Sequence, residues 1–162
     1  MEQKKILSEL GKYKENISKA LFQNADIREL ILGDTKGMSA NEMRKAFKER
    51  VKSHLFIEET IKDAATYIFY EVNIPYFNRT TKRCQIVMYI ICHRDILDDC
   101  IKEGYYGNRA DIIAEMVEES FVQDKDMANR FGIGELTIDS VNFFNSHRFY
   151  GRVLTFDVPT FR

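Results

Sequence analysis

The first third of the chain carries apolar residues at the spacing of helices. The first segment places its apolar side chains roughly on one face of a 3.6-residue repeat, at Ile6, Leu7, Leu10, Ile17, Ala20 and Leu21. Asn24 is a suitable N-cap for a second segment, which ends at Gly33. Ser39 and Glu42 have the spacing of a capping box and open a third amphipathic segment. We therefore expect a helical N-terminal region over residues 1–60.

From Thr66 onward the pattern changes to that of strands. The segment TYIFYEVNI is rich in aromatic and β-branched residues, and we expect it to end at Pro75. After the polar loop PYFNRTTKR, the segment CQIVMYIICH is apolar on both faces, which is typical of a central strand covered on both sides. Two further strands, ELTIDSVNFF and HRFYGRVLTFDV, flank a hairpin turn at Asn145 and Ser146.

The order of these segments predicts an α+β fold. A well-marked helix separates the two hairpins, which favours a mostly antiparallel four-stranded sheet with helices packed on one face. The length of 162 residues and the 44% apolar content fit a single domain over residues 1–162. Within it we expect the helical N-terminal region (1–60) and a core of sheet plus helix (61–162).

Composition narrows the classes of protein that fit. No apolar run reaches the roughly 18 residues that a membrane span needs, and the charged N-terminus does not resemble a signal peptide. The three cysteines cannot all pair, so we expect reduced thiols and assembly in a cytoplasmic environment.

Charge is divided unevenly along the chain. Residues 1–94 carry 17 Lys and Arg against 12 Asp and Glu, whereas residues 95–162 carry 7 against 13. Both halves are compatible with ordinary solvated surfaces, but opposite charges also suit pairing within the chain or head to tail between subunits. The sequence pI of about 6.3 disfavours strong non-specific binding to nucleic acid.

Motifs for catalysis and metal binding are incomplete. The string His93-Arg94-Asp95 resembles a kinase catalytic loop, but no Gly-rich phosphate loop or DFG accompanies it. A metal site from His93, Asp95, Asp98 and Asp99 matches no zinc pattern, and neither do Cys84, Cys92 and Cys100 at intervals of eight. Because no nucleophile motif is present either, we expect no enzyme, no metal and no cofactor.

The polar loop before the central strand is basic, with Arg79, Lys82 and Arg83 following Tyr76 and Phe77. Aromatic and cationic side chains of this kind suit nucleic acid. They also suit a solvated hairpin tip, which is the interpretation we favour over nucleic acid. Such a tip is equally a candidate for contact with a neighbouring protein subunit.

The stretch GYYGNRADIIAEMVEESF, residues 104–121, is the best-specified helix start in the chain. Asn108 and Asp111 have the positions of a capping box, so we assign them a structural role as helix cap. Arg109 stands at the positive end of the helix, where the dipole disfavours a cation. We therefore expect Arg109 to point outward to a carboxylate, within the fold or across a subunit boundary. Tyr105 and Tyr106 join it as candidate interface residues.

The chain resembles the small neck and tail-completion proteins of tailed bacteriophages, especially the tail-terminator type. The segments that carry this resemblance span roughly residues 60–162: VNIPYFN, RCQIVMYIICHRDI, GNRADIIAEMVEESF and GELTIDSVNFFNSHRFYGRVLTFDVPTF, the last with Tyr150-Gly151-Arg152 before its final strand.

The resemblance implies a structural protein of the virion, with a β-sheet backed by helices. Members of this group assemble into rings, often hexameric, that cap the tail tube or join it to the head. The implied partners are copies of the chain, tail-tube and head-completion proteins, and DNA passing through the lumen without sequence recognition. The alternatives are another connector part, such as a head-closure or tail-tube protein, or a small cellular domain binding nucleic acid or a ligand through residues 76–83.

Overall fold

The computed structural model describes residues 6–55, 63–78, 80–123 and 136–161. Its helices are α1 (Ile6–Gln23), α2 (Ala25–Leu32), α3 (Ala40–Arg50), α4 (Arg94–Leu97) and α5 (Arg109–Glu118), and α5 continues into the π-helical turn η1 (Glu119–Gln123). Its strands are β1 (Val51–Lys52), β2 (Thr66–Phe77), β3 (Thr81–His93), β4 (Thr137–Asn145) and β5 (Phe149–Phe161). The α+β class is therefore confirmed.

The sheet differs from the expected one in its strand number and direction. It has five strands in the order β1-β2-β3-β5-β4, and β1 pairs with β2 in parallel. The prediction of four mostly antiparallel strands is wrong at β1, since a strand of two residues is too short to leave a pattern in the sequence. The remaining pairs, β2 with β3, β3 with β5 and β4 with β5, are antiparallel.

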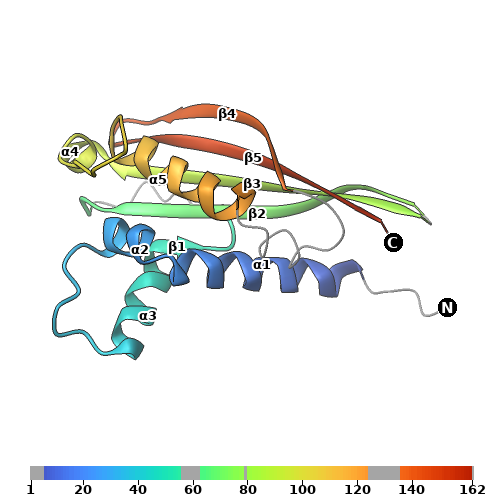
Figure 1. The fold of residues 1–162 in the computed structure, drawn as a ribbon, viewed down its shortest axis with the longest axis horizontal. Helices are drawn as coiled ribbons and strands as arrows, with labels where there is room; N and C mark the ends of the chain where they lie inside the picture. Colours follow the sequence, from blue (N-terminus) through green and yellow to red (C-terminus); the bar gives the residue numbers. More distant parts are fainter. Residues whose placement is uncertain (1–5, 56–62, 79, 124–135, 162) are drawn as a thin grey trace.

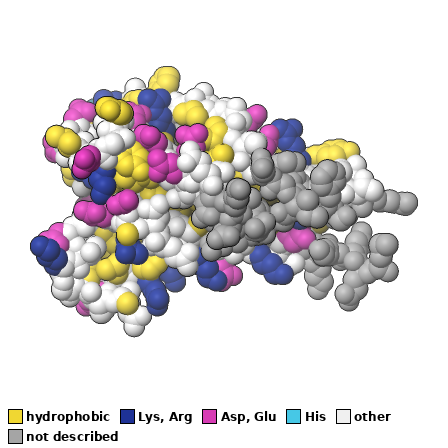
Figure 2. Space-filling view, in the orientation of Figure 1, with side chains coloured by type: hydrophobic (Ala, Val, Ile, Leu, Met, Phe, Trp, Pro, Cys, Tyr) yellow, Lys and Arg dark blue, Asp and Glu magenta, His cyan; other side chains and the backbone are white. Residues whose placement is uncertain are grey.

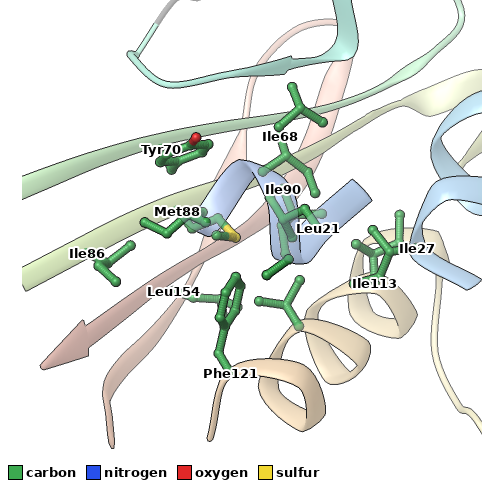
Figure 3. Packing of buried hydrophobic residues seen from close by; sticks show 14 of the residues in the cluster. Leu21, Ile27, Ile68, Tyr70, Ile86, Met88, Ile90, Ile113, Phe121 and Leu154 are labelled. Carbon is green, nitrogen blue, oxygen red and sulfur yellow. The ribbon is translucent and has the colours of Figure 1, made fainter. Parts of the chain in front are cut away.

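Helices cover one face of this sheet and enclose the main core. Alternate residues of β2, β3 and β5 point toward α1, α2 and α5, and Figure 3 shows these side chains converging between the sheet and the helices. The fully buried members include Leu21, Ile68, Met88 and Phe121. Burial of this apolar surface, at about 25 cal/mol per Å², is the main favourable term in folding.

The opposite face of the sheet is covered less completely. A smaller buried cluster lies there, formed by Ala65, Tyr67, Phe69, Ile91 and Phe149. Further along β3, Gln85, Val87 and Tyr89 are only half-buried. The expectation that this strand is covered on both sides is therefore wrong for most of its length, because the helices pack on one face only.

Strands β2, β3 and β5 continue beyond the helical layer and form an arm at the end of the molecule that also holds the C-terminus (Figure 1). Pro75 does not end β2 as expected. The register between β2 and β3 shifts between Asn73 and Tyr76, and such an irregularity accommodates a proline without a ladder hydrogen bond. The loop between the two strands is consequently short, and Tyr76 and Phe77 belong to the arm.

Candidate subunit interface

The start of α5 is fixed by reciprocal hydrogen bonds. The Asn108 side chain accepts from the backbone N–H of Asp111 at 3.0 Å, and Asp111 Oδ2 accepts from the backbone N–H of Asn108 at 3.1 Å. Gly107 precedes them with φ of 96°, and a Cβ there would lie 2.6 Å from Asp111 Oδ2. Only glycine combines this backbone conformation with so close an approach. Two of the four N–H groups that every helix start leaves unpaired are thus satisfied.

The second carboxylate oxygen of Asp111 binds Arg152 of β5. Arg152 Nε donates to Asp111 Oδ1 at 2.6 Å, and both side chains are about one-quarter to one-third exposed. This ion pair joins the helix to the sheet across 41 positions of sequence. Both oxygens of Asp111 are therefore engaged in contacts that hold the start of α5 and join it to β5.

Arg109 points into the fold, which differs from the expectation that it faces outward to a carboxylate. Its Nε donates to the carbonyl of Ile96 at 3.1 Å, and its Nη1 donates to the carbonyl of Leu30 at 3.2 Å. These carbonyls belong to the last turns of α4 and α2, where backbone oxygens lack partners within their own helix. A cation is favourable at the negative end of a helix dipole. Arg109 therefore caps two other helices from the start of a third.

The loop before α5 alternates between anchored and exposed residues. Lys102 lies 3.1 Å from Asp26 and 3.6 Å from Glu29 of α2. The Tyr105 hydroxyl donates to Glu119 at 2.8 Å, and this hydrogen bond raises the pKa of Tyr105 to about 12. In contrast, Ile101 is 98% and Tyr106 86% exposed. Of the two candidate tyrosines, only Tyr106 is fully presented to a partner.

The tip of the arm is held by one asparagine. Asn78 Oδ1 accepts from the backbone N–H groups of Thr80 and Thr81 at 2.9 and 2.7 Å, and Asn78 Nδ2 donates to the Tyr76 hydroxyl at 2.9 Å. This is an Asx-type turn, in which the side chain replaces a backbone partner. Beside the turn, Tyr76 and Phe77 are each more than half exposed.

The basic residues of the arm are engaged with carboxylates of the same chain. Lys82 is buried and forms an ion pair with Glu9 of α1. Arg83 binds Asp157 of β5 at 2.5 Å. The third candidate, Arg79, lies outside the described residues. Exposed, unpaired cations for phosphate contacts are therefore not found at the described positions of this loop.

The histidine and the cysteines considered above for catalysis or metal binding either cap a helix or are buried in the core. His93 caps α4, its Nδ1 accepting from the backbone N–H of Asp95 at 3.2 Å. Cys84, Cys92 and Cys100 are free and buried, and burial raises the pKa of Cys84 and of Cys92 to about 11. In the described part of the chain, no three His, Cys, Asp or Glu side chains are grouped to hold a metal ion.

Sequence reasoning missed several contributors to this region. Arg152 as the partner of Asp111, and Lys102 as the anchor of the loop, left no local signal because their partners are distant in sequence. Ile101 could have been found, since a β-branched apolar residue among Asp98, Asp99 and Glu103 has few neighbours with which to form a core. None of the described helices is long and apolar enough to cross a membrane.

Comparison with known proteins places the chain in a family. The model of the YomW family matches residues 14–158, which is most of the chain. This family is phage-derived and is of the type found in SPBeta and Bacillus prophages. Neither a curated protein nor a solved structure matches the chain.

Proposed function

Because the chain belongs to the phage-derived YomW family, we propose that it is a structural virion protein of a tailed phage. In this proposal copies of the chain form a ring that ends the tail tube and joins it to the head or neck. The chain acts as a tail terminator in the virion and uses neither a cofactor nor a metal. Its partners are other copies of itself and the neighbouring tail-tube and head-completion proteins.

The arm is the observation that carries this proposal. Strands β2, β3 and β5 extend beyond the helices (Figure 1), and the Asn78 side chain accepts hydrogen bonds from Thr80 and Thr81 at their tip. Tyr76 and Phe77 are exposed on this arm at 56% and 55%. Aromatic side chains are enriched at protein interfaces, so this arrangement favours contact with another protein.

The ion pairs of the basic arm residues favour an assembly role over that of a small cellular domain that binds nucleic acid. A domain that binds nucleic acid through residues 76–83 needs cations free to neutralise phosphates. Lys82 and Arg83 instead engage Glu9 and Asp157. The other connector roles, head closure or tail tube, draw on the same arm and are separated from the terminator role by experiment.

The test is the phenotype of a phage that lacks the gene, observed by electron microscopy. A protein that ends the tail tube controls its length, so we expect tails of irregular length that are not joined to filled heads. Free tails of normal length would instead indicate head closure, and absence of tube polymer would indicate a tube protein. Particles that remain complete and infectious without the protein would overturn the proposal.

A second test addresses the arm itself. The variant Tyr76→Ser/Phe77→Ser should keep its circular dichroism spectrum but fail to complement the deletion. Leu55→Ser is the matched control, because Leu55 is 48% exposed and follows β1, which pairs with Ile68 and Phe69 at the other end of β2 from the arm tip. Normal complementation by the arm variant would contradict a role for these aromatic residues.

A further inference from the structure

The loop between α4 and α5 presents an apolar and acidic surface. We use the name acidic loop for residues 98–106. Three of its residues are turned toward the protein: Cys100 is buried, Lys102 binds α2, and Tyr105 binds Glu119. The residues next to them, Ile101, Glu103 and Tyr106, are exposed. The alternation means that the fold supports the loop and directs its free side chains to solvent.

The acidic loop carries charges that the described fold does not neutralise. Asp98, Asp99 and Glu103 are exposed, and none of them has an ion-pair partner among the described residues. They flank Ile101 in sequence, and its side chain is 98% exposed. An exposed apolar residue within a charged rim is typical of a protein contact surface, where the centre is buried and the rim is polar.

Helix α3 presents a surface of opposite charge. We use the name basic face for Arg44, Lys45 and Lys48, which lie three and four residues apart and therefore on one side of the helix. All three are exposed, and within the described residues none has a carboxylate partner. Like charges at this spacing destabilise an isolated helix. Met38, 41% exposed, adds an apolar side chain just before α3.

The two surfaces lie apart on the same chain. The acidic loop follows α4, which contacts β3 and β5, whereas α3 contacts β1 and β2 at the other edge of the sheet. Figure 1 shows α4 and α3 at the same end of the molecule with the strands between them. In Figure 2 acidic and hydrophobic side chains lie together at the upper left with some basic ones among them, and the lower side carries mainly basic side chains with a few acidic ones. The charges therefore cannot pair within one copy in this conformation.

From this separation we propose that copies of the chain join head to tail, with the acidic loop of one copy against the basic face of the next. Two different surfaces in contact make a heterologous interface, which closes into a ring when the rotation allows. In this contact Ile101 and Tyr106 meet the exposed side chain of Met38, and the charges on the two surfaces fix the register. This inference rests on the proposed ring-forming function and names the surfaces that would form the ring.

Charge reversal on each surface tests the contact. One variant is Lys45→Glu/Lys48→Glu, the other is Asp99→Lys/Glu103→Lys, and a third combines all four substitutions. The association of each purified protein is measured by light scattering over a range of concentrations and at low and high salt. Lys12→Glu/Lys19→Glu is the matched control, since these exposed lysines of α1 lie outside both surfaces.

Each single-surface variant should associate about a hundredfold more weakly than the wild type, because like charges then face each other. The combined variant should recover association, since it restores opposite charges at the same contact. An equimolar mixture of the two single-surface variants should also associate, by alternation of the two chains. The control should behave as the wild type, and high salt should weaken the contact wherever it forms.

Other outcomes overturn the inference in distinguishable ways. A wild type that assembles together with single-surface variants that assemble equally well disproves this contact and leaves the virion role intact. A combined variant that does not recover also disproves it. A wild type that stays monomeric up to its solubility limit contradicts both the contact and the ring. Head-to-tail assembly by a protein whose deletion leaves phage particles complete supports the contact and contradicts the proposed function.

Discussion

At the residue scale, Gly151 has less room for a side chain than any other glycine of the described residues. It lies in β5 between Ile91 of β3 and Phe144 of β4. A Cβ at this position would stand 2.0 Å from the carbonyl oxygen of Ile90, and backbone cannot move aside as a side chain can. We expect Gly151→Ala to lower the free energy of unfolding by about 3 kcal/mol or more, as overpacking of a filled core does. Urea denaturation measures the change.

The control for this substitution is Gly11→Ala. Gly11 lies in the interior of α1, and a Cβ there meets nothing within 4 Å. Alanine is favoured over glycine in a helix by about 1 kcal/mol, so this variant should be more stable than the wild type. A Gly151→Ala variant as stable as the wild type would contradict the close approach of Gly151 to the Ile90 carbonyl oxygen.

Asp111 and Asn108 should differ in cost, although both cap the same helix. Asn108→Ala removes a capping side chain, which typically costs about 1 kcal/mol. Asp111→Ala removes a cap and also leaves Arg152 without its carboxylate, so we expect a loss of about 2 kcal/mol. Thermal and urea denaturation of the two variants give the comparison. Equal costs would mean that the Arg152 pair contributes nothing measurable.

The same residues show what sequence alone can reach. Asn108 and Asp111 are three positions apart, and the chemistry of a capping box is local, so their pattern is visible before any fold is known. The sequence predicts that Arg109 pairs with a carboxylate, because the dipole of its own helix disfavours a cation at the first turn. Its actual partners are the C-terminal carbonyls of two other helices, and their arrangement exists only after the chain has folded.

At the element scale, the buried pair of Lys82 and Glu9 holds α1 against the arm. The side chain of Lys82 is 7% exposed, and its ammonium group lies over the ring of Tyr13 at 5.2 Å. Removing one member of a buried pair leaves an uncompensated charge, so Glu9→Gln should lower the free energy of unfolding by about 3 kcal/mol. Urea denaturation measures the loss, and limited proteolysis reports whether α1 detaches first.

Two variants make this prediction specific. The double substitution Glu9→Leu/Lys82→Met replaces the pair by apolar side chains, and most of the lost stability should return. Glu15→Gln removes the carboxylate of an exposed pair with Lys19 on the same helix, which should change the free energy of unfolding very little, because water screens the pair. A loss for Glu9→Gln no larger than for Glu15→Gln would show that burial of the pair is unimportant.

Prediction of elements succeeded where local signals were complete. The capping box of Ser39 and Glu42 opens α3 in the structure, and Asn24 caps α2. The sequence predicts that β2 ends at Pro75, but the strand continues to Phe77. A register shift between Asn73 and Tyr76 accommodates the proline. The coverage of β3 was overestimated, since its apolar residues on the second face meet half-buried aromatic neighbours and no helix. Both errors concern tertiary surroundings, which periodicity does not record.

At the scale of the whole molecule, charge and shape act together. The sequence division into a basic and an acidic part corresponds in space to α3 at one edge of the sheet and the acidic loop beyond the other strands. The arm extends from the opposite end. Three separated surfaces of this kind would allow the proposed ring component to meet a tube, a head and its own neighbours at once. The sequence supplied the charges and not their positions.

Stability at alkaline pH is also a property of the whole core. Burial raises the pKa of Tyr70 to about 12 and the pKa of Cys84 and Cys92 to about 11, above ordinary values of 10.0 and 9.0. These acids are neutral in the folded state and lose their protons more readily when unfolded.

The contribution of the buried thiols to the free energy of unfolding is therefore complete below about pH 9 and is lost as pH rises through about 11. Urea denaturation across this range should show a steep fall in the free energy of unfolding, and Cys84→Ala should make the fall shallower. An unfolding free energy that stays level from pH 8 to about pH 11 would mean that these groups are accessible to water in the folded protein.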